Sequence, residues 1–256
     1  CATNRGFAGA NNLALRALGF GNRTARSQGS PDFVLLLNPD TEVIPGALAT
    51  LLRFLQSEPR AGLVVPQLAY GDGRFQHSAF KLPGLAQVWF EFFPWPGRFV
   101  ESRVNGRYPR AWSEASRPFP IECGLGAAML LRGEAIHQVG LLDEAFFMYC
   151  EEMDWCWRLR RAGWALFCQP AARIIHHEGR SASQFREQMY VTLWQSRLRL
   201  YRKHRRLSFL LAVRLLLRLG LWVEARRARQ AEQRHKLDAG ALARRLAVYR
   251  EVASLR

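Results

Sequence analysis

Short, apolar runs alternate along this chain with amphipathic helical patterns. Residues 33–37, 62–66 and 164–168 consist almost entirely of apolar residues. Residues 45–56 predict a helix whose inner side carries Leu48, Leu51, Leu52 and Leu55. Strands that are buried on both faces show such apolar runs, and alternating helices and strands are typical of a sheet that helices cover on both sides. We therefore predict an α/β fold built on a doubly wound, mostly parallel sheet.

Positive charge is concentrated near the C-terminus. The 256 residues carry a formal net charge of +16, and residues 197–256 alone hold 17 Lys and Arg residues against 4 Asp and Glu residues. The rest of the chain is nearly neutral, and a composition that is 49% hydrophobic is enough for a sizeable core. We predict a core domain over residues 1–184 and a basic helical extension over residues 185–256.

The five cysteines favour reduced thiols. Their number is odd, and no two of them have the Cys-x-x-Cys spacing of a zinc site. The sequence also shows no signal peptide. We therefore expect a cytoplasmic protein without a disulfide framework.

Two polar stretches stand where an α/β sheet commonly binds ligands. Residues 4–12 are predicted to form a small-residue loop that lets the backbone approach a ligand, before a helix that ends near Gly19. The apolar run 33–37 ends in Asn38-Pro39-Asp40, and ligands bind beyond the carboxyl ends of strands. An ordinary helix-capping loop and ordinary turn chemistry are the alternatives at these two places.

Residues 146–158 hold three carboxylates among apolar and aromatic side chains. Glu151, Glu152 and Asp154 fall in the first turn of a helix predicted over residues 151–162 and closed by Gly163. Apolar surroundings desolvate carboxylates and suit them to acid–base chemistry. The alternative is structural, because acids favour a helix N-terminus and Asp154 is spaced to pair with Arg158.

Two further features lie beside predicted strands. Cys123-Gly124-Leu125-Gly126 is a small-residue turn before an apolar strand, and such a turn brings backbone close to a bound group. A second strand, over residues 170–175, ends on His176 and His177. A histidine at this place suits a metal or phosphate contact, although imidazole also serves as an ordinary structural group.

Four of these stretches, in this order, resemble one family. They are Asn4-x-Gly6-Phe7-Ala8-x-Ala10-Asn11-Asn12, Leu36-Leu37-Asn38-Pro39-Asp40-Thr41, Phe146 to Arg158, and His176-x-x-Gly179-x-Ser181. Together they resemble the family 2 inverting glycosyltransferases, in particular their rhamnosyltransferase-like branch, over about residues 4–205. The resemblance implies a GT-A fold that moves a sugar, rhamnose in this branch, from a nucleotide diphosphate to a hydroxyl group. The acceptor it implies is a glycan or lipid-linked molecule of cell-surface polysaccharide or glycolipid synthesis.

The resemblance also implies which residues contact the substrates. The donor-binding positions are Asn4, Gly6, Phe7, Asn11, Asn12, Asn38 and Asp40. The acceptor-binding positions are Cys123, Gly124 and Gly126.

Metal binding and catalysis are implied in the same way. Asp40 and His176 correspond to ligands of a divalent metal, and oxygen ligands with phosphates suit Mg²⁺ or Mn²⁺. Asn38 stands where Asp is more familiar, which leaves one fewer charge on the metal. The catalytic base maps onto Glu152, with Glu151 in place of the usual Asp and Asp154 as a second candidate.

In this family a strand, a helix and a second strand precede the stretch that matches Asn4. The chain begins at Cys1 without them, so we expect a fragment that lacks these N-terminal strands. We hypothesise that residues 1–256 alone bind the donor weakly or not at all. Micromolar affinity for a nucleotide sugar, measured by isothermal titration calorimetry, would contradict this hypothesis.

The basic extension predicts two helices, over residues 188–206 and 207–223. The second is strongly apolar, but Arg214 and Arg218 interrupt it on one face. It therefore suits the surface of an anionic membrane better than a membrane span, and packing on the core domain is the alternative. We expect a peripheral protein on the inner face of the cytoplasmic membrane.

Two other classes of function stay open. One is a non-catalytic scaffold that has kept this fold. The other is nucleic-acid binding by the basic helices, which also carry Trp194, Tyr201 and Trp222. No nucleic-acid recognition motif in the sequence supports the second class.

Overall fold

The computed structural model describes residues 4–21, 29–93, 95–177 and 186–255. The chain divides into two compact units, Cys1–Leu82 with Gly106–Arg180, and Pro83–Asn105 with Ser181–Arg256. The second unit thus contains the predicted C-terminal extension and also a segment from the middle of the chain. The Gly179 and Ser181 positions of the fourth motif lie outside the described residues.

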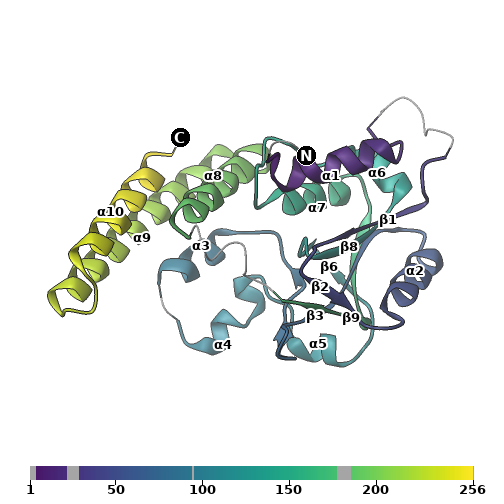
Figure 1. Ribbon diagram of the computed structural model, residues 1–256, viewed down its shortest axis with the longest axis horizontal. Coiled ribbons are helices and arrows are strands. Elements are labelled where there is room, and N and C mark those ends of the chain that lie inside the picture. The colour runs from purple at the N-terminus through teal and green to yellow at the C-terminus, as the bar shows by residue number, and fades with distance from the viewer. Residues whose placement is uncertain (1–3, 22–28, 94, 178–185, 256) are drawn as a thin grey trace. The chain divides into compact units, whose positions relative to one another are not determined.

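A seven-stranded sheet forms the centre of the first unit (Figure 1). Its main order is β1 (Phe33–Leu37), β8 (Ala128–Arg132), β3 (Ala61–Ala69), β9 (Ala165–His176) and β2 (Thr41–Val43). β4 (Phe75–Gln76) pairs with β3, and β6 (Phe119–Ile121) pairs with β9. β5 (Ala79–Phe80) and β7 (Cys123–Gly124) form a separate pair.

The α/β class is confirmed, but the prediction of a mostly parallel sheet is wrong. Among the strand pairs of the described residues, β3 and β9 run parallel, and every other pair is antiparallel. Continuous apolar runs report burial on both faces of a strand, and helices cover both faces here. Strand direction depends on the connections instead, and apolar composition carries no information about these.

Helices pack on both faces of this sheet. On one face, Leu51 and Leu55 of α2 (Ala47–Ser57) pack in a core cluster with Val64, Leu68 and Leu130. The alternate strand residues, which include Leu63 and Leu131, are fully buried as well. α1 (Gly6–Ala17), α6 (Gly133–Val139) and α7 (Glu151–Arg161) lie together along another side of the sheet, away from α2 (Figure 1).

Two element boundaries differ from the predictions. α1 begins at Gly6, so most of the predicted loop 4–12 is helical, and the Asn4 Oδ1 atom accepts a hydrogen bond from the Gly6 N–H at 3.0 Å. The two strands predicted over residues 164–168 and 170–175 are one twelve-residue strand, β9. Pro170 is tolerated within it because the pairing with β3 shifts register there, as at a β-bulge.

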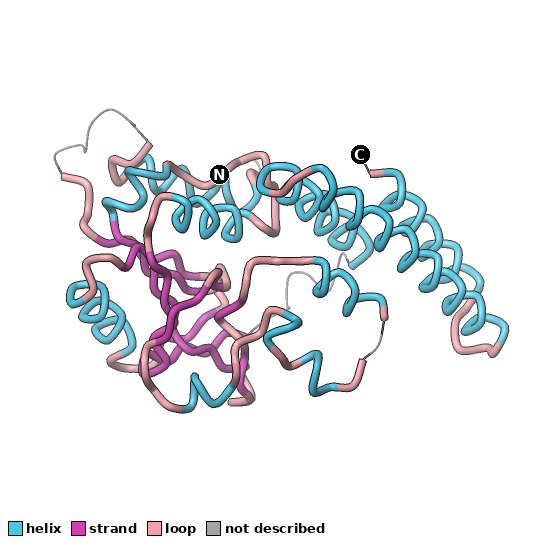
Figure 2. The backbone as a smooth tube through the Cα atoms, turned by 180° about the vertical axis from the view of Figure 1, so that it is seen from behind, coloured by secondary structure: helices cyan, strands magenta, loops and turns pink. Residues whose placement is uncertain are grey.

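The second unit is helical (Figure 2). α8 (Arg186–His204), α9 (Leu207–Gln233) and α10 (Ala239–Ser254) pack with α3 (Leu85–Phe92) around a core that includes Phe92, Trp194, Tyr201, Val213 and Leu217. The short helices α4 (Gly97–Val100) and η1 (Arg103–Asn105) complete this unit, and α5 (Arg110–Glu114) belongs to the first. Within the described residues, no helix is both long and apolar enough to cross a bilayer.

Candidate active site

Asp40 and His176 face each other on adjacent strands. Asp40 immediately precedes β2, and the antiparallel register of β2 with β9 pairs Thr41 with His176. The Asp40 Oδ1 and His176 Nε2 atoms are 3.4 Å apart. The side chain of Asp40 is 39% exposed, whereas that of His176 is 8% exposed. The two predicted metal ligands therefore lie together, and the carboxylate forms the open side of the pair.

Gln76 sets the orientation of the His176 ring. The His176 Nδ1 atom lies 3.2 Å from the Gln76 Oε1 atom, and both residues are buried. In the tautomer with the proton on Nδ1, His176 donates to this amide oxygen and Nε2 keeps its lone pair for a ligand. Gln76 was not predicted as a site residue from the sequence. Its only signal in the sequence is weak. Gln76 is a polar residue that follows Phe75 and ends the short strand β4.

The Asp40 and His176 side chains fit a hard divalent metal ion that takes most of its ligands from a bound substrate and from water. Asp40 offers a carboxylate oxygen, which suits Mn²⁺ or Mg²⁺, and His176 offers an imidazole nitrogen, which favours Mn²⁺ of the two, with phosphate and water as the remaining ligands. Within the described part of the chain, no group of three or more His, Cys, Asp and Glu side chains could hold a metal on its own. The pair therefore suits a metal shared with a bound phosphate, not an all-protein cage.

The first turn of α7 carries two carboxyl groups with altered acidity. Burial, followed by repulsion from Glu152, raises the pKa of Glu151 to about 8. Burial also raises the pKa of Glu152. The Glu151 side chain is almost fully buried, and its Oε2 atom has no hydrogen-bond partner among the described residues. A carboxyl group with the pKa of Glu151 can take up a proton near neutral pH.

Replacing Glu151 with Gln is expected to change how stability depends on pH. The folded pKa of Glu151 lies above its unfolded value, so the wild type holds a proton on folding and loses stability as the pH rises from about 4.5 to about 8. The loss is at most about 1.4 kcal/mol per pH unit. The variant lacks this titration, so its free energy of unfolding should exceed that of the wild type increasingly towards pH 8.

Urea unfolding across this pH range measures the difference. Glu144→Gln is the matched control, because hydrogen bonds from Asn12 and Arg16 lower the pKa of Glu144. Glu144→Gln should lose the contribution that the Glu144 carboxylate makes to the free energy of unfolding. This contribution is present above the unfolded pKa of Glu144 and is lost as the pH falls. Parallel pH curves for wild type and Glu151→Gln would contradict the prediction.

Three predicted site stretches meet at Gly126. A Cβ atom built on Gly126 would lie 3.7 Å from the Glu152 Cβ atom and 3.8 Å from the ring of Phe7. The neighbouring Ala127 accepts a hydrogen bond from the Asn38 N–H at 2.9 Å. The start of α1, the turn before β8 and the first turn of α7 are thus in contact, and the stretch leading to Asp40 joins them through Asn38.

The loop before α7 holds Glu152 in place. Tyr149 and Cys150 have left-handed backbone conformations, with φ of 69° and 68°, which non-glycine residues rarely adopt. The Phe147 carbonyl accepts a hydrogen bond from the Phe7 N–H at 3.0 Å. Gly6, at φ 68°, allows this approach, because a Cβ atom there would lie 2.0 Å from the same carbonyl oxygen.

Some predicted site residues have structural partners instead. Asp154 is fully buried, and its Oδ2 atom pairs with the Arg158 Nε atom at 2.8 Å, as the structural alternative predicts. The buried Asn12 side chain binds the backbone of Leu142 in both directions and also donates to Glu144. These contacts tie α7 and α1 to the residues 139–144 between them, so we leave Asp154 and Asn12 out of the functional proposal.

The remaining positions differ in how open they are. Asn11 donates to the Phe7 carbonyl at 2.9 Å, within α1. Cys123 is buried, and a Cβ atom on Gly124 would lie 2.4 Å from the Val65 side chain. Packing against β3 therefore accounts for Gly124, whereas Gly126 borders Glu152.

Comparison with curated proteins finds several glycosyltransferases that are similar to this chain. The chain is 31% identical over 193 residues to the N-acetylglucosaminyl-diphospho-decaprenol L-rhamnosyltransferase of Mycobacterium tuberculosis, a match of 71% of this chain and 58% of that protein. It is 28% identical to rhamnosyltransferase WbbL of Escherichia coli K12, over 69% of this chain and 63% of that protein. A hexosyltransferase of low-salt glycan biosynthesis, Agl10 of Haloferax volcanii, is 26% identical over 74% of this chain and 54% of that protein. The chain thus spans less than two thirds of these relatives.

Two solved structures of glycosyltransferases match this chain at low sequence identity. A mannosyltransferase of Pyrobaculum calidifontis, in complex with GDP-mannose and Mn²⁺, has 16% identity and a TM-score of 0.47 over 98% of this chain and 63% of its own. GalNAc-T7 with UDP, GalNAc and Mn²⁺ has 12% identity and a TM-score of 0.47 over 77% of this chain and 34% of its own. No family model matches the chain. The curated relatives confirm the recognition based on the four motifs: this chain is a homologue of the rhamnosyltransferases and related glycosyltransferases.

Proposed function

We propose that the protein is an inverting, metal-dependent glycosyltransferase that moves a sugar from a nucleotide diphosphate to a hydroxyl group. The observation that carries this proposal is the meeting of Glu152, Gly126 and Phe7, which links the predicted base, acceptor and donor positions. The Asn38–Ala127 hydrogen bond connects this meeting point to the stretch of Asp40. A GT-A arrangement of these parts is consistent with the mixed sheet.

In the proposed reaction, the Glu152 carboxylate accepts the proton of the acceptor hydroxyl while its oxygen attacks the anomeric carbon. The bond from that carbon to the diphosphate breaks, and the diphosphate leaves with the bonding electrons. A single displacement inverts the anomeric centre. The raised pKa of Glu152 suits this role, because a base that holds a proton more strongly accepts one more readily.

Asp40 and His176 are the residues that would hold the metal. When bound, a divalent ion offsets the charge that develops on the leaving diphosphate. The hydrogen bond between Gln76 and His176 keeps Nε2 of the imidazole turned towards Asp40. Gly126 leaves room beside Glu152, where an acceptor hydroxyl would have to lie.

The substrate classes are proposed from the relatives. The mycobacterial relative is named for a rhamnosyl group and a decaprenol-linked diphosphate sugar, and the Escherichia coli relative is named as a rhamnosyltransferase. We propose a nucleotide-activated rhamnose as the donor and a lipid-linked or glycan acceptor, on the cytoplasmic side of the membrane.

A transfer assay tests the proposal. The chain, and a second form that carries an N-terminal strand–helix–strand segment from a curated relative, are incubated with a panel of nucleotide sugars, lipid-linked acceptors and Mn²⁺. Transfer with inversion at the anomeric carbon, by either form, supports the proposal. Folded protein that transfers no sugar in either form overturns it and favours the scaffold alternative.

A further inference from the structure

One side of α9 exposes a row of apolar side chains. Leu207, Leu211, Leu215, Leu219 and Trp222 follow one another at intervals of four or three residues, so they share one face of the helix. Their exposed fractions lie between 43% and 69%. The other side of α9 is occupied, because Leu210, Val213, Leu217 and Leu221 belong to the core of the second unit. We call the exposed row the leucine face.

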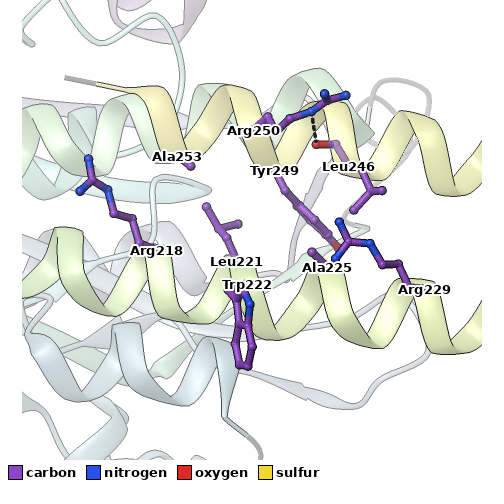
Figure 3. Close-up of a pocket in the computed structure, with 9 residues that line it drawn as sticks. All are labelled: Arg218, Leu221, Trp222, Ala225, Arg229, Leu246, Tyr249, Arg250 and Ala253. Atoms are coloured by element: carbon purple, nitrogen blue, oxygen red, sulfur yellow. Dashed lines mark hydrogen bonds between the residues drawn. The ribbon is translucent and has the colours of Figure 1, made fainter.

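Arginines continue the leucine face towards the C-terminal end of α9. Arg218 lies one helical turn from Trp222, and the Arg226 guanidinium lies over the Trp222 ring, 5.7 Å from its centre. Arg218, Arg229 and Arg250 line a pocket of about 370 Å³ between α9 and α10, together with Leu221 of α9 and Ala253 of α10 (Figure 3). No Asp or Glu lines this pocket. The leucine face is therefore mainly apolar as far as Trp222, with Arg218 within it, and arginines follow beyond Trp222.

This arrangement matches the surface of an anionic bilayer. An interfacial helix buries its apolar side chains at the level of the acyl chains while its arginines reach the lipid phosphates. Tryptophan prefers the border between these two regions, and Trp222 lies where the leucines give way to arginines. A nucleic acid would use the arginines but leave the leucines in water, so the leucine face favours a membrane.

We propose that the leucine face of α9, together with the arginine-lined pocket between α9 and α10, docks the protein on a bilayer that contains anionic phospholipids. The docking surface lies wholly within the second unit. It needs no membrane span, and it does not depend on the catalytic proposal for the first unit.

Vesicle sedimentation of the full chain tests this proposal. The vesicles contain phosphatidylcholine alone, or an equal mixture of phosphatidylcholine and phosphatidylglycerol, and a salt series is run with each. We expect binding to the mixed vesicles that weakens as salt rises. Arg218→Gln with Arg229→Gln should weaken binding about fivefold for each arginine at low salt. Leu211→Gln with Leu215→Gln should weaken it more than about tenfold at every salt concentration.

Matched controls come from the first unit. Leu48 and Leu52 on α2 are also exposed, so Leu48→Gln with Leu52→Gln makes the same chemical change away from the docking surface and should leave binding unchanged. Circular dichroism spectra of all variants should match that of the wild type, which checks that they fold. A second readout is tryptophan emission, whose shift on adding mixed vesicles should be largely lost in Trp222→Phe but kept in Trp112→Phe.

Three outcomes would overturn the proposal. They are no sedimentation with mixed vesicles, equal sedimentation with both kinds of vesicle, and binding that the leucine variants do not change. Binding to duplex DNA that depends on the arginines, without binding to mixed vesicles, would assign the basic surface to nucleic acid instead.

Discussion

The Glu152→Gln variant is expected to transfer sugar about 10²–10⁴ times more slowly than the wild type, since a general base contributes a factor of this size. Glutamine has nearly the shape of glutamate but cannot accept the acceptor's proton. The contacts of the Glu152 side chain with Gly126 concern its stem, which the variant keeps. In the form of the protein that transfers sugar, the donor affinity, measured by isothermal titration calorimetry, should therefore stay the same while the initial rate of transfer falls.

The pH dependence of transfer provides a further check on this variant. Because burial raises the pKa of Glu152, the wild-type rate should fall as the pH drops through that raised pKa and the carboxylate is protonated. Glu151, with a pKa of about 8, stays largely neutral at pH 7, so it adds no full second negative charge beside Glu152. The acid limb of the rate profile should be absent from the residual activity of Glu152→Gln.

The control for Glu152→Gln is Glu144→Gln. Glu144 is 43% exposed and pairs with Arg16 away from the meeting point at Gly126, so its replacement should leave the rate within about a factor of two, as surface changes usually do. If Glu152→Gln kept the full rate, Glu152 would not be the base. In that case the role of Glu151 would have to be tested next.

The Asp40→Ala variant is expected to lose metal-dependent transfer, with a rate reduced by about 10²-fold or more. Asp40 is the exposed carboxylate of the Asp40–His176 pair, and without it a single imidazole would be left to hold the ion. Mn²⁺ binding in the presence of a nucleoside diphosphate, followed by electron paramagnetic resonance, should weaken in parallel. This binding readout does not depend on turnover.

Two neighbouring variants make this test specific. Glu42→Gln changes an exposed carboxylate whose Oε2 atom lies 3.6 Å from the His177 Nε2 atom, and it should leave Mn²⁺ affinity unchanged. Gln76→Leu removes the acceptor of the His176 Nδ1 proton. It should weaken metal binding by about 10-fold, the lower end of what partners of metal ligands contribute. Unchanged Mn²⁺ affinity in Asp40→Ala would rule out the proposed metal position.

Local patterns in the sequence located most elements of the first unit. The helix predicted at residues 151–162 is α7, and the apolar run at residues 33–37 is β1. Strand direction was mispredicted because an apolar run has the same composition in parallel and antiparallel pairs. The start of α1 was mispredicted because small residues such as Gly6 and Gly9 suggest a loop, whereas here their size lets α1 approach its neighbours, the Phe147 carbonyl in the case of Gly6.

Long-range pairing could not be derived from local patterns. Asp40 and His176 were assigned as metal ligands by resemblance, and their proximity depends on the register of β2 with β9. Gln76 has only a weak local signal, because its role follows from where His176 lies. The packing of the Phe92 ring on Trp194 is likewise a long-range contact, because the position of Trp194 in space depends on the fold of α8.

The register of β2 with β9 also bears on how such a chain can diverge. Asp40 and His176 are brought together by adjacent backbone hydrogen bonds, including the one from the His177 N–H to the Asp40 carbonyl. Their spacing therefore does not depend on how many residues lie between them. Insertions and deletions in the long intervening segment, which includes Pro83–Asn105, can accumulate without moving either side chain. A lineage with this architecture can therefore vary these intervening loops while the Asp40–His176 pair is inherited unchanged.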